Sequence, residues 1–245
     1  MRRSDATPAR RARRALAAGV AVAFAGCAEL GLGPDLVGVL LGGGEGDLTL
    51  VAGVREALRV GAERSVSRTA RPGGFLANPL VRIALPPELE NVGRALRAVG
   101  FDGTVDELER TMNRAAERAA GEATGLLLDA VATMTIGDAR AIVRGPEDAA
   151  TRYFRSRTED ALRERFAPVV ETAMREVGLY RAYDELVTRN RVLSLLADPT
   201  VELNRYVTDE TLDGLFTVLR EEEKRIREDP AARTTDLLRE VFGGG

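Results

Sequence analysis

Apolar residues recur at every third or fourth position along most of the chain, which is the spacing of one face of an α-helix. The pattern begins at Leu48 and reaches Phe242, with one long interruption. Neither the alternation of a β-strand nor a repeat of fixed period is found. We therefore expect an all-α fold, an irregular multi-helix domain of about eight to ten helices. The expected helical stretches are, approximately, 48–68, 88–99, 104–134, 135–144, 146–177, 180–196, 199–229 and 235–242.

Residues with known positional preferences mark several helix ends. Gly100 suits the position that follows a helix, and Pro146 and Pro199 suit the first turn of one. The segment Thr104–Glu107 has the spacing of a capping box, so we expect the long third helix to open there. Thr208 predicts a further helix start.

The long interruption covers residues 69–87 and contains the strings RPGGF, NP and PP. We expect one extended loop segment here, and two interpretations of it stay open. In the first, the loop exposes its backbone and two apolar side chains as a binding lip. In the second, the loop is a connection in which Phe75, Leu76 and Ile83 fill the core. The candidate binding-loop residues are Gly73, Gly74, Phe75 and Leu76.

The start of the chain differs in composition from the helical part. Arginines precede an eleven-residue apolar run, Ala15–Ala25, and small residues then lead to Cys27, the single cysteine. A basic head, a short apolar middle and a small-residue end predict an export signal. The string FAGC resembles the lipobox of bacterial lipoproteins, in which the cysteine is lipidated and becomes the first residue. The alternative is that Cys27 is a small buried apolar residue.

These features divide the chain into three parts. Residues 1–26 are the expected lipoprotein-type signal peptide, residues 27–47 a glycine-rich tether, and residues 48–243 a single helical domain. A membrane-spanning helix needs about 20 apolar residues, so the expected anchor is the acyl chains on Cys27. Ala28 stands where many lipoproteins retained at the inner membrane have an aspartate. We therefore expect an exported protein on the periplasmic face of the outer membrane of a Gram-negative cell.

Charge and missing residue types exclude several classes of function. The whole chain has a formal charge of −3; the expected signal carries six arginines and one aspartate, so the remaining 219 residues carry −8. Phosphate backbones repel a domain of this sign, so we expect no nucleic-acid partner. The absence of histidine excludes Ser-His-Asp hydrolases and His-ligated zinc, and a single cysteine excludes an intramolecular disulfide. We expect no cofactor and no metal.

Four long strings in the helical part resemble a bacterial family. They are SRTARPGGFLANPLVRIALP (67–86), VDELERTMNRAAERAA (105–120), GPEDAATRYFR (145–155) and RYVTDETLDGLFTVLREEEKRIREDPAARTTDLLREVFG (205–243). From about Leu48 to Gly243 the chain resembles the domain-of-unknown-function family 4197. The resemblance implies an exported bacterial protein of helical fold, with no established activity and no assigned catalytic residue. The lipobox is inferred from this sequence and not from the family.

Three polar groupings are candidates for chemistry. Arg233, Thr234 and Thr235 stand at an expected helix start, where free N–H groups can hold a phosphate, sulfate or carboxylate. The alternative there is a simple N-cap by Thr235. The run 221–225 is a candidate carboxylate cluster for metal or acid–base chemistry, but opposite charges recur at i,i+4 with the residues that follow, which favours a solvated helix face. The pair Asn113-Arg114 is expected away from the apolar stripe or at its edge, lining a cleft or meeting solvent.

Two hypotheses of function follow. The first is a lipid-anchored, non-catalytic module of the cell envelope that binds a protein, a lipid or another anionic ligand. The anchor, the tether and the lack of nucleophile machinery favour it. The second is a hydrolase that uses carboxylates and arginines on an envelope or phosphate-bearing substrate. This second hypothesis requires two carboxylates in one cleft, one of them with a raised pKa.

Overall fold

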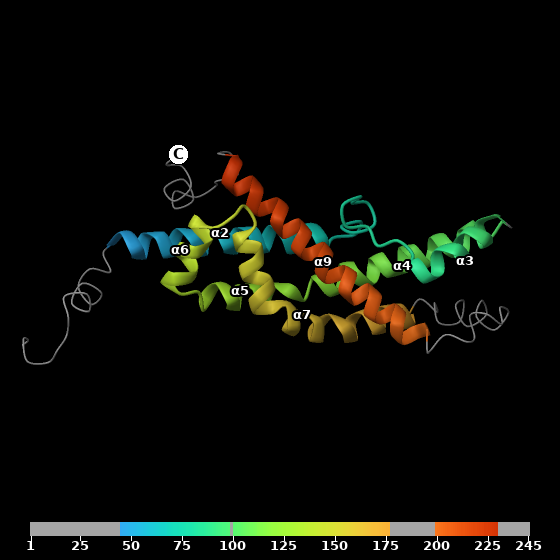
Figure 1. Cartoon of the computed structure of the whole chain (residues 1–245). Coiled ribbons are helices and arrows are strands. Elements are labelled where there is room, and N and C mark those ends of the chain that lie inside the picture. Colours follow the sequence, from blue (N-terminus) through green and yellow to red (C-terminus); the bar gives the residue numbers. More distant parts are fainter. Residues whose placement is uncertain (1–44, 99, 177–198, 230–245) are drawn as a thin grey trace, which may run out of the picture. The chain divides into compact units, whose positions relative to one another are not determined.

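The computed structural model describes residues 45–98, 100–176 and 199–229. Within these ranges the chain forms helices and no β-strand, so the all-α prediction is confirmed (Figure 1). The helices are α2 (Glu45–Thr69), α3 (Pro87–Ala98), α4 (Asp102–Ala120), α5 (Ala123–Ala132), α6 (Ile136–Arg144), α7 (Ala149–Glu176) and α9 (Pro199–Glu228). They are fewer than the eight to ten expected for the whole domain. Two of the expected stretches, 180–196 and 235–242, lie outside the described residues.

Some helix ends differ from the sequence signals. The predicted start at Thr208 is wrong, because this residue lies inside α9 and its hydroxyl donates to the carbonyl of Asn204 at 2.8 Å. A threonine in mid-helix can bond to the preceding turn in this way instead of starting a helix. The start at Pro199 is confirmed. Pro146 precedes its helix, because its carbonyl accepts a turn hydrogen bond at 3.0 Å from the N–H of Ala149, where α7 begins.

The capping box predicted at Thr104–Glu107 is also wrong, because these residues lie inside α4. Gly100 has a φ of 87° and ends α3 as expected, and α4 then starts almost at once with Phe101 as its N-cap residue. A capping box is found instead before α6. There the Thr135 hydroxyl accepts from the Asp138 N–H at 3.1 Å, and the Asp138 carboxylate accepts from the Thr135 N–H at 2.9 Å.

The core lies where α2, α4, α7 and α9 pack together. In Figure 1, α9 (red) crosses α2 and α4 and runs on along α7, and all three contact it. The largest fully buried side chains are Phe75, Phe154, Phe166, Phe216, Ile83, Met112, Leu127, Met134, Leu162, Met174, Leu212 and Leu215. Burying such a side chain stabilises a fold by roughly 1.5–3 kcal/mol, so packing holds these helices together.

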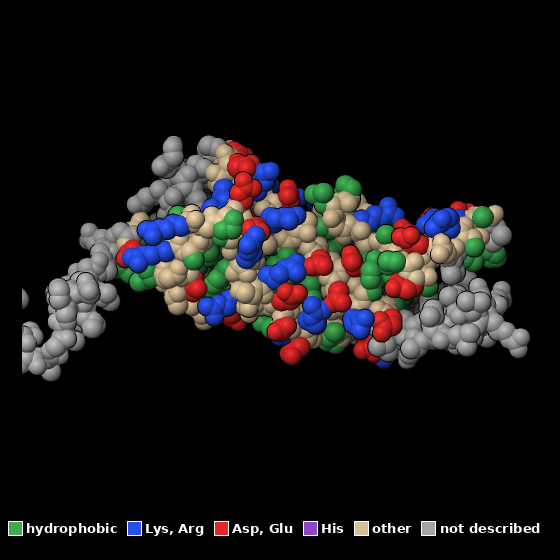
Figure 2. Space-filling view, in the orientation of Figure 1, with side chains coloured by type: hydrophobic (Ala, Val, Ile, Leu, Met, Phe, Trp, Pro, Cys, Tyr) green, Lys and Arg blue, Asp and Glu red, His purple; other side chains and the backbone are tan. Residues whose placement is uncertain are grey.

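The surface of the described part mixes charges of both signs. Figure 2 shows blue and red side chains interspersed over the visible face, with small apolar areas between them. Large apolar side chains that stay exposed are Leu48, Leu80, Phe101 and Ile136. None of the helices in the described ranges has the length and apolar character that crossing a bilayer requires.

Candidate functional site

The loop between α2 and α3, residues 70–86, is built into the core. The Phe75 ring and the Ile83 side chain have no exposed surface, and Leu76 is half-buried. A Cβ placed on Gly214 of α9 would lie 2.5 Å from the Phe75 ring, so this glycine makes room for the ring. The structure therefore shows the core-filling interpretation for Phe75 and Ile83, and the Phe75 ring is not part of an exposed lip.

Two glycines give this loop its path. Gly73 has a φ of 79°, in the left-handed region that glycine adopts at no steric cost. A Cβ on Gly74 would lie 2.3 Å from the carbonyl oxygen of Thr69, a contact that only glycine avoids. Backbone geometry therefore requires both residues, whatever else they do. That the segment 73–76 binds a ligand stays a prediction.

A row of polar side chains on α4 holds the loop in place. Glu109, Asn113 and Glu117 follow at i,i+4 spacing, and all three are buried. Asn113 accepts a hydrogen bond from the Ile83 N–H at 2.9 Å and donates to the Ile83 carbonyl at 2.7 Å. Glu117 accepts from two successive N–H groups of the loop at 3.2 and 3.3 Å. The expectation that Asn113 lines a cleft or meets solvent is wrong, because its side chain is fully buried and serves the loop backbone, which needs polar partners. Arg114 is exposed.

Glu109 joins three parts of the fold. Its carboxylate pairs with Arg82 of the loop at 2.6 Å and with Arg97 of α3 at 3.2 Å. Arg97 pairs in addition with Asp106 of α4 at 2.6 Å, and this hydrogen bond raises the pKa of Arg97 above its ordinary value. Glu109, at the N-terminal end of the row, thus fastens α3 and the loop to α4, which is a structural role.

The acidic run of α9 is not a solvated face, so that prediction is wrong. Glu222 has no exposed surface and Glu223 is only 7% exposed, whereas Glu221 is half-buried. The expected i,i+4 pair of Glu223 with Arg227 is present at 2.9 Å, but it lies inside the fold. The carboxylate of Glu222 pairs with Arg68 of α2. Spacing along α9 indicates partners on the same helix and says nothing of the helices that cover them.

Glu223 caps α7 from a different helix. Its carboxylate accepts from the N–H groups of Ala150 and Thr151, both at 2.9 Å, and from the Thr151 hydroxyl at 2.8 Å. Arg227 donates to the same carboxylate at 2.9 Å and to the carbonyl of Ile142 at 2.9 Å. The first N–H groups of a helix lack partners within it and favour negative charge. One carboxylate of α9 thus fixes the start of α7, and its arginine partner holds the end of α6.

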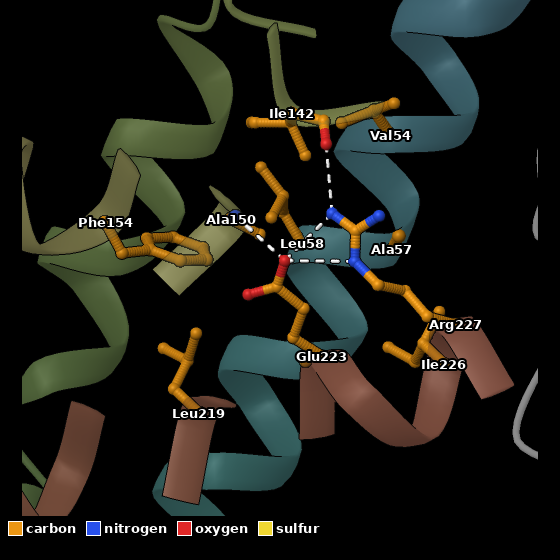
Figure 3. A pocket seen from close by; sticks show the side chains of 11 residues that line it. Val54, Ala57, Leu58, Ile142, Ala150, Phe154, Leu219, Glu223, Ile226 and Arg227 are labelled. Atoms are coloured by element: carbon orange, nitrogen blue, oxygen red, sulfur yellow. Dashed lines mark hydrogen bonds and ion pairs between the residues drawn. The ribbon is translucent and has the colours of Figure 1, made fainter. Parts of the chain in front are cut away.

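A small pocket opens beside this carboxylate. Figure 3 shows it among α2, α6, α7 and α9, and its empty space is about 380 Å³, open solvent included. Its apolar lining consists of Val54, Ala57, Leu58, Gly61, Ile142, Ala150, Phe154, Leu219 and Ile226. Glu223 and Arg227 are the charged side chains among these lining residues, and they are bonded to each other. The paired carboxylates that the hydrolase hypothesis requires are not found in this lining.

Two side chains on α9 that the sequence did not indicate as candidates have raised pKa values. Burial raises the pKa of Tyr206 to about 12, and nearby glutamates add to the effect. Burial also raises the pKa of Glu210, with the charge of Asp213 adding to it. The Tyr206 hydroxyl donates to the carbonyl of Ala84 at 3.3 Å, so it too helps to hold the loop. No sequence motif indicates these two residues, because the groups that surround them come largely from distant parts of the chain.

Two predicted sites lie outside the described residues. They are the lipidation site at Cys27 and the anion site at Arg233, Thr234 and Thr235. Across residues 45–98, 100–176 and 199–229, no group of three or more Asp, Glu, His or Cys side chains is placed to hold a metal ion.

The fold and these contacts define an all-α domain whose buried carboxylates serve helix ends, a core-filling loop and interhelical ion pairs. The chain belongs to a family described as protein of unknown function, DUF4197, whose sequence profile matches residues 45–243. This confirms the resemblance seen in the sequence, and the match starts at the first residue of α2. No curated protein and no solved structure matches the chain.

Proposed function

We propose that this protein is a non-catalytic binding module of the bacterial cell envelope, held at a membrane by lipid on Cys27. The observation that supports a non-catalytic role is that its buried carboxylates bind partners within the fold. Glu117 and Glu223 bind backbone N–H groups, and Glu222 binds arginines of α2 and α9. A carboxylate that acts as general acid or base must instead reach the substrate.

The alternative, a carboxylate- and arginine-based hydrolase, has less support. The pocket of Figure 3 is lined by one carboxylate, Glu223, which already accepts hydrogen bonds from five donors. Two carboxyl groups in different environments are the usual way to divide acid and base roles. The described residues therefore favour binding over hydrolysis.

The location rests on the sequence before α2. The basic head, the apolar run and the string FAGC suit export and lipidation, and the glycine-rich residues 27–47 suit a tether, although the last three of them already belong to α2. The charge of −8 after Gly26 favours partners other than nucleic acid.

Mass spectrometry of the protein from membranes of a Gram-negative host tests this proposal. We expect the wild-type chain to begin at Cys27 and to carry acyl chains there, and the Cys27→Ser protein to lack them. A wild-type chain that keeps residues 1–26, or that is found in the soluble fraction without acyl chains, contradicts the anchor.

A further inference from the structure

A second recess lies between the first turns of α7 and the middle of α9. Its empty space is about 410 Å³, open solvent included. Asp148, just before α7, lines it together with Thr151, Arg152 and Arg155 of α7, and Phe216, Thr217 and Arg220 line it from α9. Arg152 and Arg155 are three residues apart on α7, and Phe216 and Arg220 are four apart on α9, so one face of each helix contributes. Three guanidinium groups from two helices therefore share one hollow.

The arginines of this recess keep unused hydrogen-bond donors. Arg220 makes no hydrogen bond, ion pair or ring contact with any residue in the part of the chain that the structure describes. Arg152 uses its Nε on Asp148 at 2.9 Å, and its two Nη groups have no partner among the described residues. The guanidinium groups of Arg152 and Arg220 can thus both donate hydrogen bonds to a bound anion.

The third arginine is held in place. Arg155 donates to Asp213 at 2.7 Å, and its guanidinium lies over the Phe216 ring, 4.6 Å from the ring centre. Both contacts restrict the side chain, and the ring shields one face of the cation. Arg155 therefore forms a fixed cationic wall against which a ligand can rest.

The backbone at the start of α7 does not contribute donors. The N–H groups of Ala150 and Thr151 are bonded to Glu223, and the N–H of Arg152 is bonded to the carbonyl of Asp148. Recognition must come from the side chains of the recess. A guanidinium presents parallel N–H groups that match the oxygens of a phosphate, and two such groups suit a tetrahedral oxyanion better than a planar carboxylate.

Arginine is abundant in this protein, since 34 of its 35 basic residues are arginine. The presence of a single arginine is therefore no indication of a binding site. Most described arginines are paired with acids, as Arg163 is with Asp209 and Arg68 with Glu222. What sets the recess apart is the combination of a hollow, three guanidinium groups and open N–H donors on two of them.

We propose that this recess binds a phosphate group, which Arg152 and Arg220 hold against the wall that Arg155 forms. The inference deepens the proposed function and rests on it, because it names the ligand chemistry of the binding module. A free phosphorylated compound and the phosphate of a lipid headgroup present the same oxyanion to the three arginines.

Calorimetric titration of the full-length protein in neutral detergent with inorganic phosphate, at constant ionic strength set by chloride, tests the site. We expect saturable binding by the wild type. Arg220→Gln should bind at least about tenfold more weakly, because the substitution removes charge-assisted hydrogen bonds to the phosphate. Arg165→Gln is the matched control, because Arg165 is an exposed arginine of α7 with no partner among the described residues. Circular dichroism checks that each variant is folded.

Equal binding by all three proteins, or no binding by the wild type, overturns the proposal. If Arg220→Gln fails to fold, Arg152→Gln provides the same comparison from the other helix. Titration with a short-chain phosphatidic acid distinguishes the sources. Arginine-dependent binding tighter than that of inorganic phosphate indicates a lipid headgroup, and equal binding indicates a free phosphate. The titrations do not depend on acylation, so an unacylated Cys27 would contradict the anchor and leave the phosphate result standing.

Discussion

The most informative perturbation of this fold is Glu223→Ala. In the native structure one carboxylate serves the N–H groups of Ala150 and Thr151, the Thr151 hydroxyl and Arg227. Ala150 and Thr151 are themselves buried, so water cannot simply replace the lost partner. The substitution therefore removes a helix cap and an ion pair at the same place.

The expected cost can be worked out from these contacts. Each buried donor left without a partner costs about 1–3 kcal/mol, and loss of a helix cap costs about 0.5–2 kcal/mol. Removing one member of a buried ion pair costs about 3–5 kcal/mol. These contributions overlap, so we expect Glu223→Ala to lower the free energy of unfolding by about 3–5 kcal/mol. A domain is stable by only about 5–15 kcal/mol, so the effect is easily measured.

Urea unfolding followed by far-ultraviolet circular dichroism is a suitable assay. Glu221→Ala is the matched control, because Glu221 stands two residues away on α9 and makes no hydrogen bond or ion pair with the described residues. We expect the control to change stability by no more than about 0.5 kcal/mol. If Glu223→Ala does not fold, Glu223→Gln keeps the shape and should cost about 1–3 kcal/mol. Equal small effects of Glu221→Ala and Glu223→Ala would refute the buried cap.

Three further substitutions test other contacts by the same unfolding assay. Gly214→Ala should destabilise by about 1–3 kcal/mol, because its Cβ would lie 2.5 Å from the Phe75 ring. Asn113→Ala should cost about 2–4 kcal/mol, because it leaves the buried backbone of the loop without partners. Asp138→Ala should cost about 1 kcal/mol at neutral pH, the value of a helix cap.

The Asp138 effect should also depend on pH. Hydrogen bonds from Thr135 lower the pKa of Asp138 below its ordinary 3.8. A lowered pKa in the folded state means that the stabilisation is present above the unfolded pKa and is lost as pH falls through the folded one. The difference between wild type and variant should therefore vanish in strong acid.

For Gly214→Ala the control is Gly125→Ala in α5, where a Cβ meets open space and stability should not fall. An unchanged loop in Asn113→Ala, judged by hydrogen exchange, would contradict its role.

Much of the helical architecture is readable from the sequence. The 3.6-residue period predicts α3 and α6 to within one residue and α2 to within three, because an amphipathic helix carries its own signal in every turn. Gly100 and Pro199 also act through their own backbone geometry, so their helix ends are predicted correctly. Two errors occur at Thr104 and Thr208, where a residue suited to capping lies inside a helix. Two others are Pro146, which precedes α7, and the expected stretch 104–134, which divides into α4 and α5.

The roles of the polar side chains, in contrast, could not be predicted from the sequence. In the sequence Glu223 is the last of three successive glutamates that precede two basic residues, and Asn113 stands among arginines and alanines. Their partners lie 73 and 30 residues away, and nothing local distinguishes a solvated glutamate from one that caps another helix. The same holds for the phosphate recess, since Arg152 and Arg220 meet only when α7 packs on α9.

By itself, the sequence determined the helical class, most helix extents, the family and the expectation of an exported, acidic protein. Those properties depend on neighbours within one helical turn, on backbone angles of single residues, or on composition. Only the tertiary structure decided which carboxylates are buried, that Phe75 fills the core, and which arginines share a hollow. The physical reason is that burial and hydrogen bonding depend on which surfaces meet, and in an all-α fold those surfaces come from helices far apart in the chain.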